Sequence, residues 1–430
     1  MKNRAAITKL AAEICAGKPG ADKALDQLAR HADEPAVAWR LAAVAFGGAG
    51  RYDFAAKAQH KAIDAVGGMT DTSPHDRMYL ADLFRHAGRT DTSRTVVTDL
   101  LADHPDFLPA RLTFASLASM TKDFAEAARR YRAILADHPD NVFALDGLAR
   151  AAGWIGAHDE ARKAGGKSLT LKDRIVSASD PHWQISDKGA LPYDPSKPER
   201  NIIAYSLWGS DARYLDSLTG NVDVARDLFP AWQCRIYCDR TVPSGAMTQL
   251  RSLGAQIVLM PTPPVRHASL LWRFLAADDP GIDRVLFRDA DAKLTVRERV
   301  AVDDWLASDK AFHLMRDWWS HTDLMLAGMW GAVGGQLTGI KSLMEAHVAK
   351  VSVPNRQIDQ QFLASLVWPS IRNHTLIHDD LFGVLGARPF PPFARLPEGQ
   401  HVGMNVSAAS PRTRMITPRL TIRKPAGESA

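Results

Sequence analysis

The sequence contains few cysteines and no long apolar run. Its 430 residues include three cysteines, Cys15, Cys234 and Cys238, too few for a disulfide framework and without the spacing of a zinc site. Its apolar runs are too short to cross a bilayer. The apolar stretch near the start is too short and interrupted for a signal peptide. These absences predict a cytoplasmic protein, with Cys234 and Cys238 as small core residues.

A strong excess of charge of one sign is also missing. Lysine and arginine number 53 and aspartate and glutamate 48, which gives a net charge of +5 and a pI of about 9.0. This mild positive charge fits an anionic small ligand. No stripe of basic and aromatic residues accompanies it, so we expect no nucleic-acid partner. The length allows two or three domains with an ample core.

The first third of the chain carries an internal repeat. Leu101-Ala-Asp-His-Pro-Asp106 returns as Leu135-Ala-Asp-His-Pro-Asp140, 34 residues later. This period resembles that of the tetratricopeptide repeat, in which small and aromatic residues lie where paired helices touch. The residues that match in this register are Leu80, Ala81, Phe84, Ala115, Ala127, Tyr131, Leu148, Ala149, Ala152 and Ala161.

An earlier unit extends the repeat towards the N-terminus. Trp39, Ala42, Ala43, Phe46 and Ala55 fit the same pattern. Residues 35–163 are therefore expected to form about three and a half to four repeats, behind a leading helix or cap. Stacked repeats offer a concave surface to extended polypeptides, so the resemblance implies a protein partner. The alternatives are that the repeats make a homo-oligomer or support the second domain.

A proline-rich stretch over residues 177–199 breaks every period and is expected to be an interdomain linker. We therefore predict a two-domain fold. An all-α tetratricopeptide-like helical repeat domain covers residues 1–176, and an α/β domain covers 200–400. The tail over 401–430 turns rich in Ser, Pro and Arg and is expected to be a loose cover or partly disordered.

Strands and helices alternate in the second domain. Predicted strands cover 201–207, 234–238, 255–260, 285–287 and 310–315. Predicted helices over 213–228, 246–253, 269–277 and 296–308 lie among them. This β-α-β alternation predicts an open, twisted, doubly wound sheet.

An acidic pair follows the fourth predicted strand. Val285-Leu286-Phe287 is an apolar run that suits a buried strand, and Asp289 and Asp291 come directly after it. The carboxyl end of a strand is where open α/β sheets bind ligands. Residues two apart in extended chain point the same way. Both carboxylates are thus expected to face one Mg²⁺ or Mn²⁺, which completes its shell with waters and substrate phosphates.

An open sheet with Asp-x-Asp after its fourth strand resembles the type A fold of nucleotide-sugar glycosyltransferases. Leu271-Trp-Arg273-Phe-Leu, 16 residues ahead of Asp289, is similar to an element of glycogenin-like and bacterial lipopolysaccharide galactosyltransferases. The resemblance implies that Arg273 faces the donor diphosphate, which a guanidinium fork suits. Ser206 and Trp208, where the first strand ends, are further candidate donor-binding residues.

Two later segments extend the resemblance. Gly328, Met329 and Trp330 stand where the family has a small-residue loop under the donor sugar, although Ala327 replaces the family's Asn. Asp359-Gln-Gln matches an element whose acidic residue lies beside the transferred sugar. By this resemblance Asp359 is a catalytic candidate that holds sugar hydroxyls or stabilises positive charge at the anomeric carbon. Its alternative role is a helix N-cap.

The third metal ligand is assigned by order in the chain. A histidine late in the domain completes the metal shell in the family, and His378 fits by its place after an apolar run. Trp318 and Trp319 are candidates either for stacking on a sugar or acceptor side chain or for packing.

We therefore predict a metal-dependent glycosyltransferase that uses Mn²⁺ or Mg²⁺. Its donor is a nucleotide sugar, and its acceptor is a protein recruited by the repeats. The alternatives are a glycan- or lipopolysaccharide-directed enzyme of the same kind and a catalytically inactive adaptor.

Overall fold

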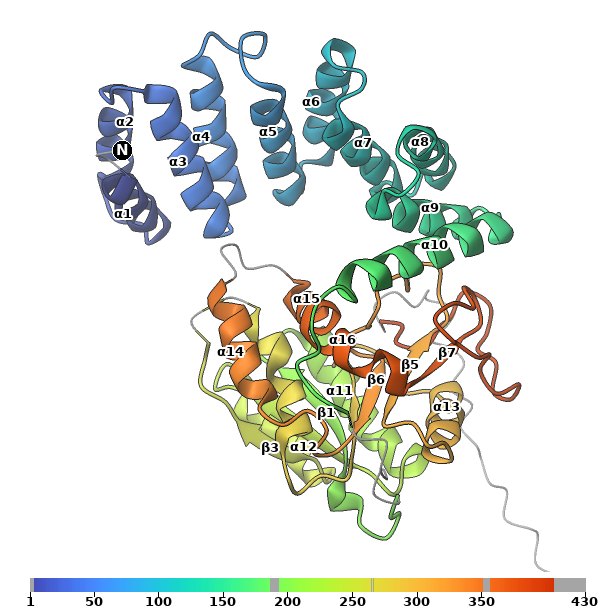
Figure 1. The fold of residues 1–430 in the computed structure, drawn as a ribbon. Helices are drawn as coiled ribbons and strands as arrows, with labels where there is room; N and C mark the ends of the chain where they lie inside the picture. Colours follow the sequence, from blue (N-terminus) through green and yellow to red (C-terminus); the bar gives the residue numbers. More distant parts are fainter. Residues whose placement is uncertain (1–3, 186–192, 264, 266, 351–355, 406–430) are drawn as a thin grey trace, which may run out of the picture.

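The computed structural model describes residues 4–185, 193–263, 265, 267–350 and 356–405. Figure 1 shows two parts: a curved row of helices, and beside it a domain built on one β-sheet. Residues 186–192 of the expected linker and 406–430 of the expected tail lie outside the described residues.

Ten α-helices in the described part of the chain precede the sheet and form five hairpins. They are α1 (Arg4–Cys15), α2 (Ala21–Arg30), α3 (Pro35–Gly48), α4 (Tyr52–Asp64), α5 (Pro74–His86), α6 (Thr90–Asp103), α7 (Leu108–Met120), α8 (Phe124–Asp137), α9 (Val142–Trp154) and α10 (His158–Val176). The leading helix or cap expected before residue 35 is a full hairpin, α1 and α2. Among the described helices, none is both long enough and apolar enough to cross a membrane.

The last three hairpins repeat at the expected period. The first helices of these hairpins begin at Pro74, Leu108 and Val142, each 34 residues after the one before. The matched small residues, from Ala81 to Ala161, are buried between helices. The tetratricopeptide-like repeat region is therefore confirmed.

Local signals determine where several of these helices start. Ser73, Asp123 and Asn141 accept hydrogen bonds from backbone N–H groups in the first turns of α5, α8 and α9. Gly88 and Gly156, in the turns inside two hairpins, both have φ of 77°. Side chains with a Cβ rarely adopt this conformation, so glycine keeps these turns short.

In the described residues the second part contains a single sheet of seven strands. Their spatial order is β3 (Gln256–Leu259), β2 (Gln233–Cys238), β1 (Asn201–Leu207), β4 (Arg284–Phe287), β6 (Trp330–Val333), β5 (Phe312–Arg316) and β7 (Thr375–Asp379). The first four strands along the chain are parallel. β6 is antiparallel to β4 and β5, and β7 is parallel to β5. The sheet is therefore mixed.

The predicted strands correspond to β1–β5, and the unpredicted β6 lies where a loop was expected. Gly331 explains the close strand packing there: a Cβ at this position would lie 2.9 Å from Leu286 Cδ2 and 3.0 Å from the Val285 carbonyl oxygen. In β2, burial raises the pKa of the Cys234 thiol to about 12 and that of Cys238 to about 11. Both cysteines are core residues, as expected.

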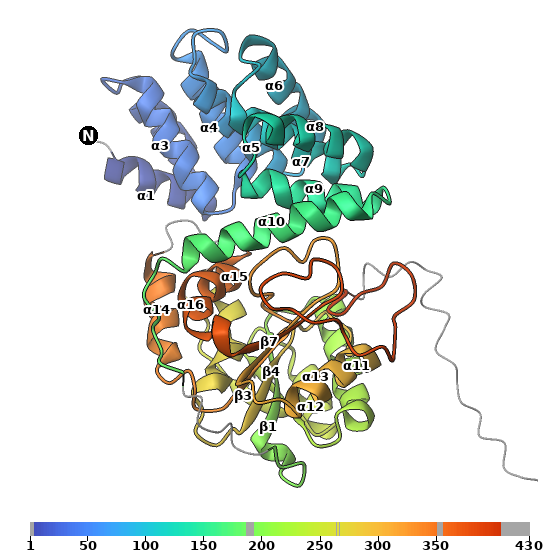
Figure 2. The same ribbon diagram turned by 45° about the vertical axis from the view of Figure 1, so that its right-hand side comes forward.

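Helices pack around this sheet (Figure 2). They are α11 (Ala212–Leu228), α12 (Ser244–Ser252), α13 (Val296–Leu306), α14 (Ile340–Lys350), α15 (Ile358–Phe362) and α16 (Trp368–Ile371). The predicted helix over 269–277 is the 3-10 helix η2 (Ala268–Asp278), and a π-turn, η3 (Leu363–Val367), joins α15 to α16. Two further 3-10 turns, η1 (Pro198–Arg200) and η4 (Arg372–His374), precede β1 and β7.

The repeat region and the sheet domain share a hydrophobic core. Figure 2 shows α10 running across the sheet domain. Buried residues of α8–α10 belong to the same cluster as those of the sheet, whereas those of α1–α6 form a separate cluster. Helix α7 contributes to both, with Ala115 and Ala118 in the first and Ala110 and Leu117 in the second. Trp319 and Phe382 fill the space beside Gly153 and Gly165, because a Cβ on either glycine would lie 2.1–2.2 Å from the facing ring. The hydrophobic core is therefore continuous across residue 176, where the boundary between the two domains was expected.

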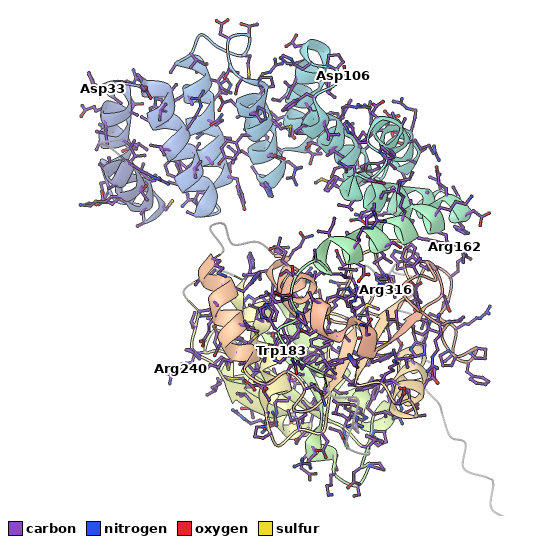
Figure 3. All side chains as sticks on the ribbon, in the orientation of Figure 1. Asp33, Asp106, Arg162, Trp183, Arg240 and Arg316 are labelled. Carbon is purple, nitrogen blue, oxygen red and sulfur yellow. The ribbon has the colours of Figure 1, made fainter. Side chains whose placement is uncertain are left out.

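Polar contacts reinforce this joint. Lys172 Nζ donates to the Thr322 carbonyl oxygen at 2.9 Å, and Trp368 Nε1 donates to Asp173 Oδ1 at 2.8 Å. Beyond α10, Trp183 Nε1 donates to the Thr338 carbonyl oxygen at 2.8 Å (Figure 3). Part of the expected linker is therefore anchored on the sheet domain.

Candidate active site

The acidic pair lies beyond the carboxyl end of a central strand. β4 is parallel to β1, so Asp289 and Asp291, which follow β4, emerge at the same edge as Trp208, which follows β1. The Asp289 side chain is 43% exposed. Asp291 is partly buried, and burial together with the nearby Asp289 raises the pKa of the Asp291 carboxyl.

Arg273 joins this pair to a carboxylate from another part of the chain. Its Nη1 lies 2.5 Å from Asp289 Oδ1, and its Nη2 lies 2.8 Å from Asp359 Oδ2. Arg273 is fully buried, and its backbone N–H donates to Ser206 Oγ at 3.0 Å. Three separately predicted residues, Asp289, Arg273 and Asp359, thus meet at one place, with Ser206 behind them.

The contacts change the expected roles of two of these residues. Arg273 uses both terminal nitrogens on carboxylates, so it holds Asp289 and Asp359 in place. Asp359 is buried in α15, and its Oδ1 accepts from the Gln360 N–H at 2.9 Å. Burial raises the pKa of the Asp359 carboxyl, and nearby Asp289 adds to the shift. Asp359 is not the helix N-cap, a position that Gln357 occupies.

The small-residue segment lies partly under the acidic pair. A Cβ on Gly328 would lie 2.2 Å from Asp289 Oδ2, so glycine is required for this approach. The expected contacts of Met329 and Trp330 with the donor are wrong, because both side chains are buried. Trp330 is fully buried in β6, where its ring lies 4.0 Å from that of Phe287, and Met329 is buried against Gly403.

His378 is not a third ligand to the acidic pair in this structure. It is buried in β7, with Nδ1 2.9 Å from His313 Nε2 and Nε2 2.9 Å from Asp304 Oδ2. Both ring nitrogens therefore have other partners. Asp304, in α13, also accepts from Arg388.

Several residues near the pair were not predicted. Arg213 lies in the first turn of α11, and the positive charges of Arg213 and Arg356 both favour ionisation of the Tyr214 hydroxyl. The charge of Arg213 also favours ionisation of the Asp291 carboxyl. Arg213 Nη2 donates to the Tyr214 hydroxyl oxygen at 2.5 Å. Asn405, from the expected tail, donates to Asp291 Oδ2. Of these residues, only Arg213 could have been singled out from the sequence, since it begins the predicted helix that follows the turn after β1.

The side chains around the pair fit a hard divalent cation. They offer two carboxylates at one sheet edge, and in the described residues no third carboxylate or histidine joins them closely enough to complete a cluster. Mg²⁺ and Mn²⁺ accept such a partial oxygen shell and fill it with water or substrate phosphate oxygens.

A second group of ligating side chains lies outside this pair. One ligand atom from each of Asp317, His321 and His401 lies within 4.8 Å of the other two. The Trp318 ring stacks on His401 with centroids 5.0 Å apart and meets Trp154 of α9 edge-on at 5.6 Å. Trp319 is buried against α9 and α10. These two tryptophans therefore pack in the joint between the two parts.

Comparisons with known proteins concern the helical part of the chain. No protein-family model matches the chain, and no curated protein matches it. A crystal structure of MamA is 15% identical, with a TM-score of 0.32, over 38% of this chain and 94% of its own. MamA from Desulfovibrio magneticus RS-1 is 16% identical, with a TM-score of 0.30, over 33% of this chain and 76% of its own. Kinesin light chain-type repeats of Podospora anserina are 17% identical, with a TM-score of 0.31, over 41% of this chain and 98% of their own.

At these identities and TM-scores the likeness supports no statement about fold or function. The spacing and burial of the hairpins define the class of this chain independently. It is a tetratricopeptide-like helical repeat region followed by a mixed seven-stranded sheet domain.

Proposed function

We propose that the sheet domain is a metal-dependent glycosyltransferase of type A, which moves a sugar from a nucleoside-diphosphate donor to an acceptor hydroxyl. The observation that carries the proposal is the assembly of Asp289, Arg273 and Asp359 beside Asp291 at the carboxyl edge of β4. Open α/β sheets bind ligands at this edge. A buried arginine held between two carboxylates keeps that site rigid.

In this proposal Asp289 and Asp291 hold Mn²⁺ or Mg²⁺ with the donor phosphates. When bound, the cation supplies Lewis-acid stabilisation of the charge that develops on the leaving diphosphate. Arg213, whose charge reaches Asp291 and Tyr214, and Arg356, whose charge reaches Tyr214, add positive charge for the phosphates. Arg273 and Asp359 are positioning residues, because their contacts are with one another and with Asp289.

The transfer breaks the bond between the anomeric carbon and the donor phosphate oxygen. A new bond forms between that carbon and the acceptor oxygen, the acceptor proton leaves to a base, and the nucleoside diphosphate departs. The protein's main contribution is to hold the two reactants in place.

The proposed acceptor is a protein segment held by the repeat row. Stacked helical hairpins bind extended polypeptides on their inner surface. The shared core and the Lys172 and Asp173 contacts keep the repeats at a fixed position relative to the sheet domain. A segment bound on the repeats would therefore be held at a defined distance from the acidic pair.

A screen of nucleotide sugars for hydrolysis, with Mn²⁺ or Mg²⁺ present, tests the activity. One or two donors should turn over, and Asp289→Asn/Asp291→Asn should reduce turnover by more than the roughly 10–100-fold that loss of an outer-shell partner of a metal ligand costs. The control is Asp303→Asn, an exposed carboxylate of α13 paired with Arg299. Equal turnover in the native chain and the Asp289→Asn/Asp291→Asn variant would remove the proposed site.

A glycan-directed enzyme would label extracted glycan rather than protein in a sugar-transfer assay, and that result would remove the protein acceptor.

An inactive adaptor is favoured by one observation, since Arg273 and Asn405 already occupy oxygens of the pair. Thermal-shift titrations with UDP and GDP distinguish this case. An enzyme should show Mn²⁺-dependent stabilisation that is lost in Asp291→Ala, whereas an adaptor with a closed site should show none.

A further inference from the structure

The segment 401–405 crosses from strand β5 to the acidic pair. At its start, the Val402 N–H donates to Asp317 Oδ1 at 3.0 Å, directly after β5. Further along, the Lys293 N–H donates to the Met404 carbonyl oxygen at 3.3 Å, and Asn405 pairs with Ala292 and donates to Asp291. We call residues 401–405 the strap. A ligand that holds His401 in place would therefore also hold Asn405 against Asp291.

The first residue of the strap is oriented for ligation. His401 Nδ1 lies 2.9 Å from the Val402 carbonyl oxygen, which can only accept, so Nδ1 carries the hydrogen. The Nε2 lone pair is then available. Histidines that bind metals commonly donate their other ring N–H to a carbonyl in this way. Stacking on Trp318 further restrains the ring.

The other two side chains are buried and also held. Asp317 Oδ2 accepts from Arg297 Nε at 3.1 Å and from the Val402 N–H at 3.2 Å. Asp317 Oδ1 accepts from the same Val402 N–H at 3.0 Å, so Oδ1 keeps one further lone pair for a cation. His321 is four residues after Asp317, with Nδ1 4.0 Å from Asp317 Oδ1. The Asp317 N–H donates to this Nδ1 at 3.1 Å. A cation bound at Nδ1 replaces that hydrogen bond between two neutral groups.

We propose that Asp317, His321 and His401 bind a transition-metal ion, Zn²⁺ in the first instance, and that this ion anchors the strap to the end of β5. Two imidazoles and one carboxylate are a ligand set for zinc and related ions, whereas Mg²⁺ prefers oxygen alone. The ligand atoms lie within 4.8 Å of one another. Tetrahedral bonds of about 2.1 Å place ligand atoms roughly 3.4 Å apart, so binding draws the three side chains together. Three protein ligands leave one position for water.

This site differs from the acidic pair in chemistry and in the residues it uses, so the two can be tested apart. Full-length protein is incubated with Zn²⁺, freed of loose metal by gel filtration, and analysed for metal content by mass spectrometry. Co²⁺ provides a second readout, because tetrahedral nitrogen-oxygen coordination has intense visible absorption. One Zn²⁺ per chain is expected, with visible Co²⁺ bands.

The variants are His401→Gln, in the strap, and His321→Ala, in the buried part of the site. Each is expected to weaken Zn²⁺ binding at least tenfold and to remove the Co²⁺ bands. The controls are His104→Ala, an exposed histidine of the repeat region, and Asp289→Asn/Asp291→Asn. Both should retain the metal, even if the proposed transferase activity fails.

His401→Gln keeps the experiment decisive if His321→Ala does not fold, since His401 is only partly buried whereas His321 is buried. The proposal is overturned if the native chain retains no Zn²⁺ after gel filtration. It is also overturned if folded His401→Gln, with a native circular-dichroism spectrum, binds Zn²⁺ within twofold of the native affinity.

Discussion

The repeat region and the sheet domain differ in what they bury. Buried positions in the repeats are mostly alanine and other small residues, and Arg77 is the one buried charged side chain among the described repeat helices. The sheet domain buries many charged or titratable side chains: Arg235, Arg273, Arg284, Arg288, Arg297, Arg316, Asp283, Glu298, His313, His321, Asp359, His378 and Asp379. Figure 3 labels Arg316 in this domain.

The difference indicates where chemistry and stability reside. A hairpin of the repeat row packs mainly against its neighbours, so its energetics are local. Buried charges require partners from distant parts of the chain, and they define a rigid site only when all partners are in place. We therefore expect the candidate chemistry in the sheet domain and a positioning role for the repeats.

The largest expected contrast comes from removing one arginine in each part. Arg273→Met leaves Asp359 buried without its partner and should lower the free energy of unfolding by about 3–5 kcal/mol. Arg132→Met removes an equally well-formed pair with Glu160 at the surface and should cost less than about 1 kcal/mol. Urea unfolding of the two variants measures both values. Similar losses would contradict the contrast between the two parts.

The second contrast concerns glycines at the joint. Gly165→Ala forces a Cβ to within 2.2 Å of the Phe382 ring and should destabilise the chain by about 1–3 kcal/mol through overpacking. Gly48→Ala, at the end of α3, meets no atom within 4 Å and should be neutral or stabilise by up to about 1 kcal/mol. Thermal melts should order the variants in this way. A neutral Gly165→Ala would mean that the repeats and the sheet domain do not pack as described.

The smallest expected effect is a pH dependence from a buried histidine. Burial, with His378 nearby, lowers the pKa of His313 well below its usual 6.5. The unfolded chain therefore takes up the proton more readily, and stability falls as the pH drops below about 6.5. His313→Phe, which keeps a ring beside Trp305, should flatten the fall in melting temperature between pH 7 and pH 5.

The exposed His104 of the repeat region provides the matched control for this slope. His104→Ala should leave the pH dependence unchanged. An unchanged slope in His313→Phe would show that other groups account for any acid sensitivity of the sheet domain.

The sequence predicted features that depend on short-range pattern. The 34-residue spacing and the small residues at helix contacts recur along the chain, so they identified the repeat region. Strand β4 and the position of Asp289 and Asp291 after it were also readable, because an apolar run followed by carboxylates is a local signal. β6 was missed because Gly328 and Gly331 in its neighbourhood resemble a loop.

Contacts between distant residues required the tertiary structure. Nothing local distinguishes His378, which pairs with His313 and Asp304, from His401, which joins Asp317 and His321. The partner of a buried side chain depends on which strands become neighbours, and the order β4-β6-β5-β7 cannot be read from any short window. The sequence alone thus determined the repeat, strands β1–β5 and the acidic pair. The fold decided which charges meet, because burial makes each of them depend on a partner far along the chain.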